Sequence, residues 1–474
     1  MQILLRPRDR RHRATVHLNI QHPTPNIQHP TSGRGRGEGA NSFLGFSGAK
    51  RVGLSVCSLL FLLLCPSAGP AASARWTIDD VSGALAQTEA PVASVARLKK
   101  SQAAAARSGR LGLAETVGKA ASPTVVPVQW DPVATGAELR AVWLMPSGMA
   151  GPRQFEWRES KASFPAVMQA ARDAASGQID ITDSGKPVLR YNYKTVEPGE
   201  MLNKVTPGNL IYTRARSDYI HPLYGLNGEV LTRDWSIDHP HHRGIYWAWP
   251  EVDFGTNRGD LHALQKVFAR PTGKVRLQSG PVFAEIEAEN QWLWEDREPI
   301  VREQAIIRAY RATAQGRLVD LAFRFVALKD GVTLARRGTE HYGGLNVRMA
   351  TPAAQDISVH TDPSNAVPRR AWSDLSGVFG AAGTASGLSV FQYPRNPDYP
   401  GDWIQYPALS WCQPTFPAAG TRYALPRGKP LELHFRLLIH SGAKPGDDRA
   451  AKLWDAFQAS TAAVTSFSIS GAAE

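Results

Sequence analysis

Cysteine is scarce in this chain, with 3 residues among 474. Cys57 and Cys65 lie in an apolar stretch near the N-terminus, which leaves Cys412 alone in the remainder. A lone cysteine forms no internal disulfide and no cysteine-based zinc site, so neither device stabilises the body of the protein. No histidine stands near Cys412 in the sequence, and we expect it to be a small buried residue rather than a nucleophile.

Several other patterns are absent. No GxGxxG motif follows a strand pattern, and there is no P-loop and no regular alternation of strands with helices. No repeat of 20–50 residues marks a propeller or a solenoid. These absences argue against nucleotide-binding α/β folds and repeat architectures.

Excess positive charge is confined to the beginning of the chain. The net charge is +12, but residues 1–51 hold nine Lys or Arg and two Asp or Glu, a net of +7. The remaining residues therefore carry only +5 and show no stripe of Lys or Arg. We expect no nucleic-acid partner, because such proteins concentrate basic residues on one face.

The N-terminal residues resemble an export signal rather than a folded element. Residues 1–51, with the direct repeat IQHPT, read as a disordered or wrongly included leader. Lys50 and Arg51 then precede the uncharged run Val52–Leu64, and small residues follow up to Ala74. This order predicts a signal peptide over 52–74 and an exported, periplasmic or extracellular protein. An uncleaved anchor is the alternative; after cleavage no stable membrane span remains.

The rest of the chain is predicted to be all-β. Residues 75–135 read as a linker with an Ala-rich helix at Val92–Ala106, and 136–204 as a small β module in which Phe164–Ala174 has helical spacing. Residues 205–474 read as a large antiparallel sandwich, because short runs with alternating apolar residues follow one another between turn signals. The predicted strands are Leu210–Ala215, Lys274–Gln278, Val282–Trp292, Ile300–Arg311, Leu318–Leu328, Leu345–Met349, Leu388–Tyr393 and Leu431–Ile439, and a final helix is predicted at Asp447–Ala463.

The densest group of chemically active residues lies at 233–250, RDWSIDHPHHRGIYWAWP. His239, His241 and His242 fall within four positions, beside Asp238 and Arg243. Imidazole transfers protons near neutral pH or binds a metal. The cluster therefore predicts either an acid–base site or a divalent metal site formed by the three histidines. Trp247 and Trp249 follow closely, and their faces suit a sugar ring.

A second group, GTEHYGGLNVR, contains Glu340, His341 and Arg348. Glu340 is a candidate base, and Arg348 is suited to bind an anionic or hydroxyl-rich group. The simpler alternative is a turn with solvated charges, since turns favour the same residues. His221, before Pro222, is a weaker candidate for substrate binding.

These segments resemble a known family. The stretch HPLYGLNGEVLTRDWSIDHPHHRGIYWAW, followed by ENQWLW and EHYGGLNVRMA, is similar to the bacterial PmoA-like proteins, often labelled "methane oxygenase PmoA". The resemblance covers roughly Val188–Ala450. It implies a secreted or cytoplasmic β-sandwich protein of glycan-degrading bacteria, similar to the galactose-mutarotase supersandwich, in which a His and a Glu act on a sugar. Because no long apolar spans are present, we do not expect methane oxidation.

We therefore expect an exported carbohydrate-active enzyme, an epimerase, lyase or hydrolase. His239 and His242 would act as acids or polarising groups and Glu340 as the base. The residues expected to bind substrate are Arg243, Trp247, Trp249, His341, Arg348, His221 and Asp238. No cofactor is expected on this hypothesis. Two alternatives stay open: a metal-dependent enzyme such as an oxygenase, with a divalent metal on His239, His241 and His242, and a non-catalytic glycan-binding module.

Overall fold

The computed structural model describes residues 75–96, 98–117, 120–132, 139–359, 371–380, 383–460 and 467–469. The predicted leader and signal peptide lie outside the described residues. Within those residues, no helix is long and apolar enough to cross a membrane. The fold is mostly β: helices are few, every pairing between named strands is antiparallel, and no sheet in the described ranges closes into a barrel.

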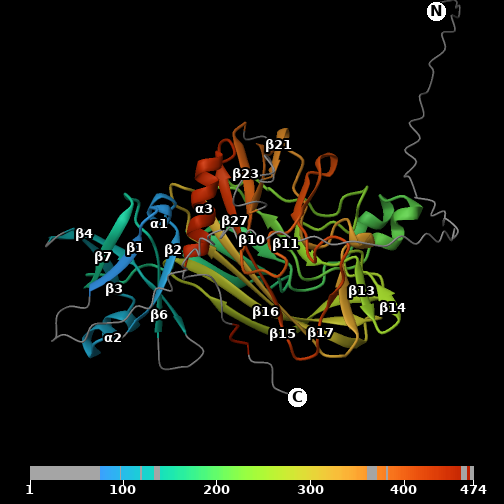
Figure 1. The fold of residues 1–474 in the computed structure, drawn as a ribbon, viewed down its shortest axis with the longest axis horizontal. Helices are drawn as coiled ribbons and strands as arrows, with labels where there is room; N and C mark the ends of the chain where they lie inside the picture. Colours follow the sequence, from blue (N-terminus) through green and yellow to red (C-terminus); the bar gives the residue numbers. More distant parts are fainter. Residues whose placement is uncertain are drawn as a thin grey trace, which may run out of the picture. The chain divides into compact units, whose positions relative to one another are not determined.

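An eight-stranded sheet forms the largest element of the protein (Figure 1). In order across the sheet its strands are β15 (Val267–Gln278), β16 (Phe283–Trp294), β17 (Glu298–Tyr310), β18 (Arg317–Ala327), β27 (Leu431–Ser441), β23 (Ala385–Gln392), β22 (Trp372–Val378) and β21 (Ala353–Val359). The alternation along β18 explains the strand, because Leu321 and Phe323 enter the core while Asp320 on the other face pairs with Arg436.

A six-stranded sheet packs against this one. Its strands, in order, are β20 (Gly344–Val347), β12 (Ile245–Ala248), β11 (Ile220–Leu223), β10 (Lys186–Tyr191), β9 (Ile179–Asp183) and β8 (Met168–Arg172). Trp247 on β12 crosses to the larger sheet, where its ring lies 4.1 Å from that of Phe323 and its indole nitrogen donates to Glu303 at 2.6 Å. One apolar core therefore joins the two sheets.

Two small sheets and four short 3-10 helices complete this part of the fold. The first sheet contains β14 (Asn257–Gly259), β13 (Glu251–Phe254), β19 (Val332–Ala335) and β26 (Tyr423–Ala424), and the second contains β24 (Trp403–Tyr406) and β25 (Trp411–Pro414). The helices are η1 (Gly199–Asn203), η2 (Pro207–Tyr212), η3 (Arg337–Thr339) and η4 (Pro407–Leu409).

The N-terminal region forms two further sheets. One contains β1 (Arg75–Asp80), β7 (Gly151–Glu159), β3 (Leu111–Val117) and β4 (Ala120–Pro127), and the other β2 (Pro91–Ala96), β6 (Leu139–Leu144) and β5 (Gln129–Pro132). The α-helices are α1 (Ala84–Gln87), α2 (Lys100–Arg107) and α3 (Asp447–Ala459). Helix α3 packs on β27 and on β6, so it bridges the N-terminal region and the large sheet (Figure 1).

Polar contacts hold the N-terminal region on the outer face of the large sheet. The Gln129 side-chain oxygen accepts the backbone N–H groups of Val282 and Phe283 at 3.0 and 2.9 Å. Asp131 pairs at 2.9 Å with Arg308, which is almost fully buried and also binds Glu285. A buried guanidinium between two carboxylates is costly to separate from either partner.

Some local predictions were wrong. Residues 92–96 of the expected helix Val92–Ala106 are in β2, and α2 begins only at Lys100. Phe164–Ala174, with helical spacing, contains the edge strand β8, since pairing with β9 overrides the local pattern. The predicted strand Leu210–Ala215 begins in η2, which Pro207 starts. The strands of 75–159 form the N-terminal sheets, whereas β8 to β10 belong to the main body, so the sheets group differently from the predicted modules 75–135 and 136–204.

Candidate metal centre

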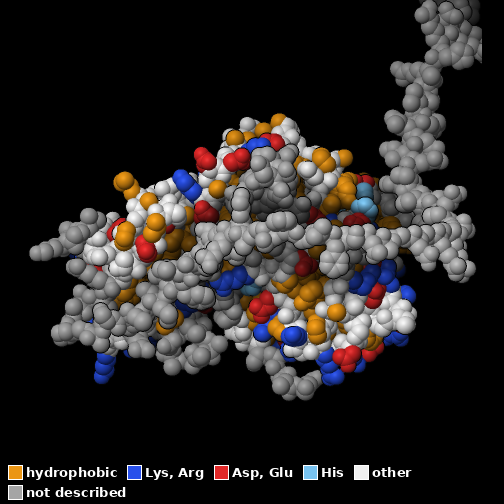
Figure 2. Space-filling model, in the orientation of Figure 1, with side chains coloured by type: hydrophobic (Ala, Val, Ile, Leu, Met, Phe, Trp, Pro, Cys, Tyr) orange, Lys and Arg blue, Asp and Glu red, His pale blue; other side chains and the backbone are white. Residues whose placement is uncertain are grey.

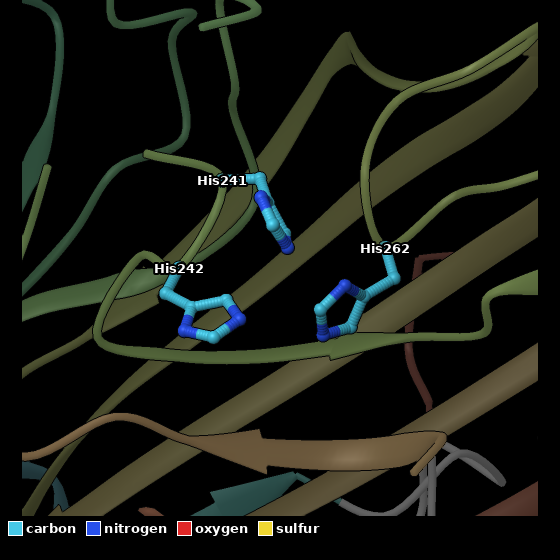
Figure 3. Close-up of side chains that lie close together, drawn as sticks. All are labelled: His241, His242 and His262. Carbon is cyan, nitrogen blue, oxygen red and sulfur yellow. The ribbon is translucent and has the colours of Figure 1, made fainter. Parts of the chain in front are cut away.

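Three histidines from two separate loops converge beside β12. One nitrogen from each of His241, His242 and His262 lies within 4.8 Å of the corresponding nitrogens of the other two. Figure 3 shows the three rings turned toward a common space, with His262 facing the other two across it. In the described part of the chain this is the group of His, Cys, Asp and Glu side chains suited to a metal ion.

The loop that carries His241 and His242 is closed at both ends. Asp234 and Arg243 form an antiparallel bridge, and the His242 N–H donates to the His239 carbonyl at 3.0 Å. Gly244, with φ of 62°, then turns the chain into β12. A Cβ atom there would lie 2.2 Å from the Ile220 carbonyl oxygen, so this turn requires glycine.

Arg243 stabilises this loop instead of facing a substrate. Its side chain is fully buried and donates to Asp234 and to the Tyr219 hydroxyl. The guanidinium also lies 3.6 Å from the centre of the Trp235 ring, a cation–π contact. The predicted substrate-binding role of Arg243 is therefore replaced by a structural one.

His262 lies at the end of a turn after β14. The N–H groups of Leu261 and His262 donate to the Trp249 carbonyl at 3.0 and 3.3 Å. Arg216 donates to the His262 carbonyl at 2.5 Å, and the Tyr246 hydroxyl lies 2.9 Å from His262 Nε2. Because Nε2 contacts the tyrosine, Nδ1 is the nitrogen that His262 offers to the other two histidines.

Burial keeps the three imidazoles neutral. Burial lowers the pKa of His241 to about 3, assisted by the neighbouring charges of His239, Arg216 and Arg337. Burial likewise lowers the pKa of His242 and of His262 well below the usual value, and the other histidines add to the effect. Neutral imidazole is the form that binds a metal, so these rings need lose no proton first.

The donor set fits a transition-metal ion. Imidazole nitrogens suit such ions, and the Nδ1 atom of His262, the nitrogen that does not contact Tyr246, is buried without a hydrogen-bond partner within the described ranges. Two nitrogens bound to one zinc ion in a tetrahedral site lie about 3.4 Å apart. Nitrogens that lie within 4.8 Å of one another therefore need to approach by up to about 1.4 Å on binding.

An indole does lie against the histidines, but it is Trp411 of β25. Its ring centre is 4.4 Å from that of His242, and Nε1 donates to Gln413 at 2.6 Å. Trp247 and Trp249, predicted to stack on a ligand, are 3% and 0% exposed. Both lie in the core between the sheets, where a sugar ring has no access to them.

His239 and Asp238 lie at the more exposed side of the cluster. Their side chains are 34% and 51% exposed and contact each other at 3.1 Å. The His239 ring stacks on that of His242 with centres 4.7 Å apart, but it is not one of the three converging nitrogens. Asp238 also lies 3.8 Å from buried Arg348, whose Nη2 donates to Ser236 at 3.3 Å. Histidines reach the face seen in Figure 2 beside acidic and hydrophobic side chains.

In the second predicted group, residues 338–348, the side chain that contacts the triad is Tyr342 and not Glu340. The Tyr342 ring centre lies 4.9 Å from that of His262, and Arg337 donates to the Tyr342 hydroxyl at 3.3 Å. Glu340 and His341 are exposed, and no contact recorded for the described residues joins either side chain to the triad. His221 is half-buried, with Nδ1 2.9 Å from the Thr232 hydroxyl, and burial lowers its pKa.

Sequence reasoning found two of the three converging histidines and assigned His239 in place of His262. The residues it did not select are His262, Tyr246, Trp411, Arg216, Arg337 and Tyr342. His262 stands alone in GDLHALQ, twenty residues after the cluster, so no spacing signal marks it. Tyr342 lies between His341 and Gly343, and only the backbone direction at that turn decides which side chain faces the triad.

The comparison with protein families covers all of these residues. Residues 178–455, more than half of the chain, match the model of a family of unknown function, DUF6807. The chain belongs to this family. No curated protein matches it. The DUF6807 region includes the three histidines, Tyr246, Tyr342 and Trp411, but not the N-terminal sheets.

Proposed function

We propose that the protein is a metal-dependent enzyme whose centre is formed by His241, His242 and His262. The observation that carries the proposal is the convergence of three imidazoles from two loops, two of them buried and His241 half-buried, with one nitrogen of each within 4.8 Å of the others. Structural zinc sites take four protein ligands, whereas catalytic sites take three and leave a position for water or substrate. Three histidines without a fourth protein ligand among the described residues fit the catalytic type.

The chemistry of such a centre is Lewis-acid chemistry. Imidazole ligands suit zinc, copper, iron and nickel, and zinc is the simplest choice because it needs no redox partner. A bound ion polarises a substrate oxygen or lowers the pKa of a bound water toward 7. The chain's own residues orient the ligands: Tyr246 holds the His262 ring, and Trp411 packs against His242.

We propose a carbohydrate substrate and export from the cell. The support is the resemblance of 188–450 to PmoA-like proteins, the signal-like sequence at 52–74, and the two packed antiparallel sheets, which are compatible with a supersandwich. Half-buried Tyr212 and Tyr342 flank the triad, with ring centres 5.0 Å from His241 and 4.9 Å from His262. On this proposal their faces, and not those of Trp247 and Trp249, would meet the sugar ring.

Metal-free acid–base catalysis is the second candidate. The observation in its favour is the partly exposed pair of Asp238 and His239, in contact at 3.1 Å. Against it, the predicted acid His242 is buried and neutral, and the predicted base Glu340 is exposed without a recorded contact to the histidines. The geometry therefore favours the metal centre.

Metal analysis tests the proposal. The full chain, purified and dialysed against chelator, is titrated with Zn²⁺ in competition with a chromophoric chelator. We expect about one tightly bound ion per chain, the stoichiometry of a three-ligand catalytic site. His262→Gln should lose that site, while His434→Gln, at a histidine near Tyr393, should retain it.

Two results would count against the metal centre. One is a wild-type protein that binds no ion, and the other is binding that His262→Gln leaves unchanged. If turnover of a glycoside persists in chelator, the acid–base candidate replaces it. Ligand binding without turnover in the metal-loaded protein would instead indicate a glycan-binding module.

A further inference from the structure

We propose that the centre binds a sugar acid, a substrate that carries a carboxylate beside its hydroxyl groups. This inference rests on the proposed metal centre and names the substrate class of that site. It follows from the charges that surround the three histidines.

The ligand set leaves the charge of an ion uncompensated. All three donors are imidazoles, which bind a metal in their neutral form, and no carboxylate belongs to the converging group in the described part of the chain. A divalent ion held only by neutral ligands keeps its double positive charge and becomes the strongest local charge. An anionic oxygen as the next ligand is therefore favoured over a neutral hydroxyl.

Arg216 adds a second positive charge behind His262. Its side chain is buried, 4% exposed, and donates to the carbonyls of Leu261 and His262. The carboxyl groups of Asp218 and Asp260 act on its charge, and its Nε atom is buried without a hydrogen-bond partner among the described residues. A guanidinium in this position raises the electrostatic potential at the triad, and Asp260 opposes it only in part because the same carboxylate also pairs with Arg337.

Arg337 and Arg348 add further positive charge near the three histidines, Arg337 through Tyr342 and Arg348 beside Asp238. Arg337 contacts the Tyr342 hydroxyl and pairs with Asp260 at 2.5 Å, and its side chain is 43% exposed. Arg348 is buried and lies 3.8 Å from Asp238, which contacts His239. Arg337 is connected to the triad through Tyr342, whose ring centre lies 4.9 Å from that of His262.

Positive charge therefore exceeds negative charge around the centre. The three arginines are opposed by the carboxylates of Asp238 and Asp260, and a bound ion would add two further positive charges. A substrate carboxylate compensates this excess, and guanidinium groups bind carboxylates with directional hydrogen bonds. Half-buried Tyr212 and Tyr342 then face the ring of the same molecule, which makes a sugar acid a better match than a small free anion.

Ligand titration of the cobalt-substituted protein tests the inference. The full chain is loaded with Co²⁺, and its visible absorption is followed during titration with glucuronate, glucose and acetate. We expect glucuronate to bind at least about tenfold more tightly than either of the other two, a difference of about 1.4 kcal/mol. Arg337→Gln should weaken glucuronate by about tenfold and leave glucose unchanged. Arg297→Gln, at an exposed arginine of the β16–β17 turn, is the matched control and should change neither.

Each contrary result has a distinct meaning. Equal binding of glucose and glucuronate would overturn the proposed role of charge. Acetate binding as tightly as glucuronate would overturn the role of the sugar ring. A protein that binds no Co²⁺ would instead contradict the metal centre itself, so the two proposals fail separately. Retained Co²⁺ stoichiometry in Arg337→Gln shows that the variant has kept the site.

Discussion

A buried carboxyl pair behind the site makes a prediction about stability and pH. Asp218 accepts hydrogen bonds from Tyr191 at 2.7 Å and Asn290 at 3.0 Å, and Glu303 accepts the indole N–H groups of Trp247 and Trp292, each at 2.6 Å. Burial raises the pKa of both carboxyls, and each is hydrogen-bonded to the other. The folded protein therefore retains a proton on this pair that the unfolded chain releases above about pH 4.

The sign of the effect follows from that retained proton. A group whose pKa is raised in the folded state contributes most stability below its unfolded pKa and loses it as pH rises. One proton corresponds to about 1.4 kcal/mol per pH unit in the free energy of unfolding. Asp218→Asn keeps the shape and supplies an N–H donor to Glu303 without needing the proton. The free energy of unfolding of the variant, relative to that of the wild type, should therefore rise by about 1.4 kcal/mol for each pH unit above 5, until the pair ionises in the folded wild type.

Urea denaturation of wild type and Asp218→Asn at several pH values between 5 and 8 measures this difference. Asp330→Asn, at an exposed aspartate of the turn after β18, is the control and should parallel the wild type throughout. The reasoning is refuted if the free energies of Asp218→Asn and wild type differ by a constant amount across the range, because the folded pair would then hold no extra proton.

Three further predictions concern the centre and the large sheet. Tyr246→Phe removes the hydroxyl beside His262 Nε2 and should lower zinc affinity about 10–100-fold in chelator competition, with unchanged circular dichroism; unchanged affinity would show that this contact does not orient the ring. Zn²⁺ at about 100 times its Kd should raise the free energy of unfolding by about 2.7 kcal/mol, seen as a higher Tm that His262→Gln abolishes. Asp320→Ala leaves buried Arg436 unpaired and should cost about 3–5 kcal/mol in urea denaturation, whereas a loss below 1 kcal/mol would mean that water reaches the guanidinium.

The mostly β fold could be predicted from the sequence because alternation is a local signal. Apolar and polar side chains alternate along Leu318–Leu328 and along Val282–Trp292. The structure forms β18 and β16 at these positions. Predictions failed where pairing partners decided the structure, as in Phe164–Ala174. Its Met168 pairs with residues of β9 and of the distant turn at Gly280. No pattern within the segment encodes those partners.

The site was located only in part for a similar reason. Three histidines within four positions mark a loop with unusual chemistry, and that loop does carry two of the converging nitrogens. The third comes from His262, whose position depends on the Trp249 carbonyl and on Arg216. Trp247 resembled a ligand-binding aromatic because sequence does not distinguish an indole that faces a cleft from one that faces the opposite sheet.

The attachment of the N-terminal sheets has a practical consequence for anyone who trims the protein to its family match. A fragment of residues 178–455 would begin after β8 and stop inside α3, which ends at Ala459. It would also remove Gln129 and Asp131. The backbone N–H groups of Val282 and Phe283 would then lose their acceptor, and Arg308 would lose one of its carboxylate partners. Expression trials should therefore retain the chain from residue 75 onward, because these contacts of the large sheet come from the N-terminal sheets.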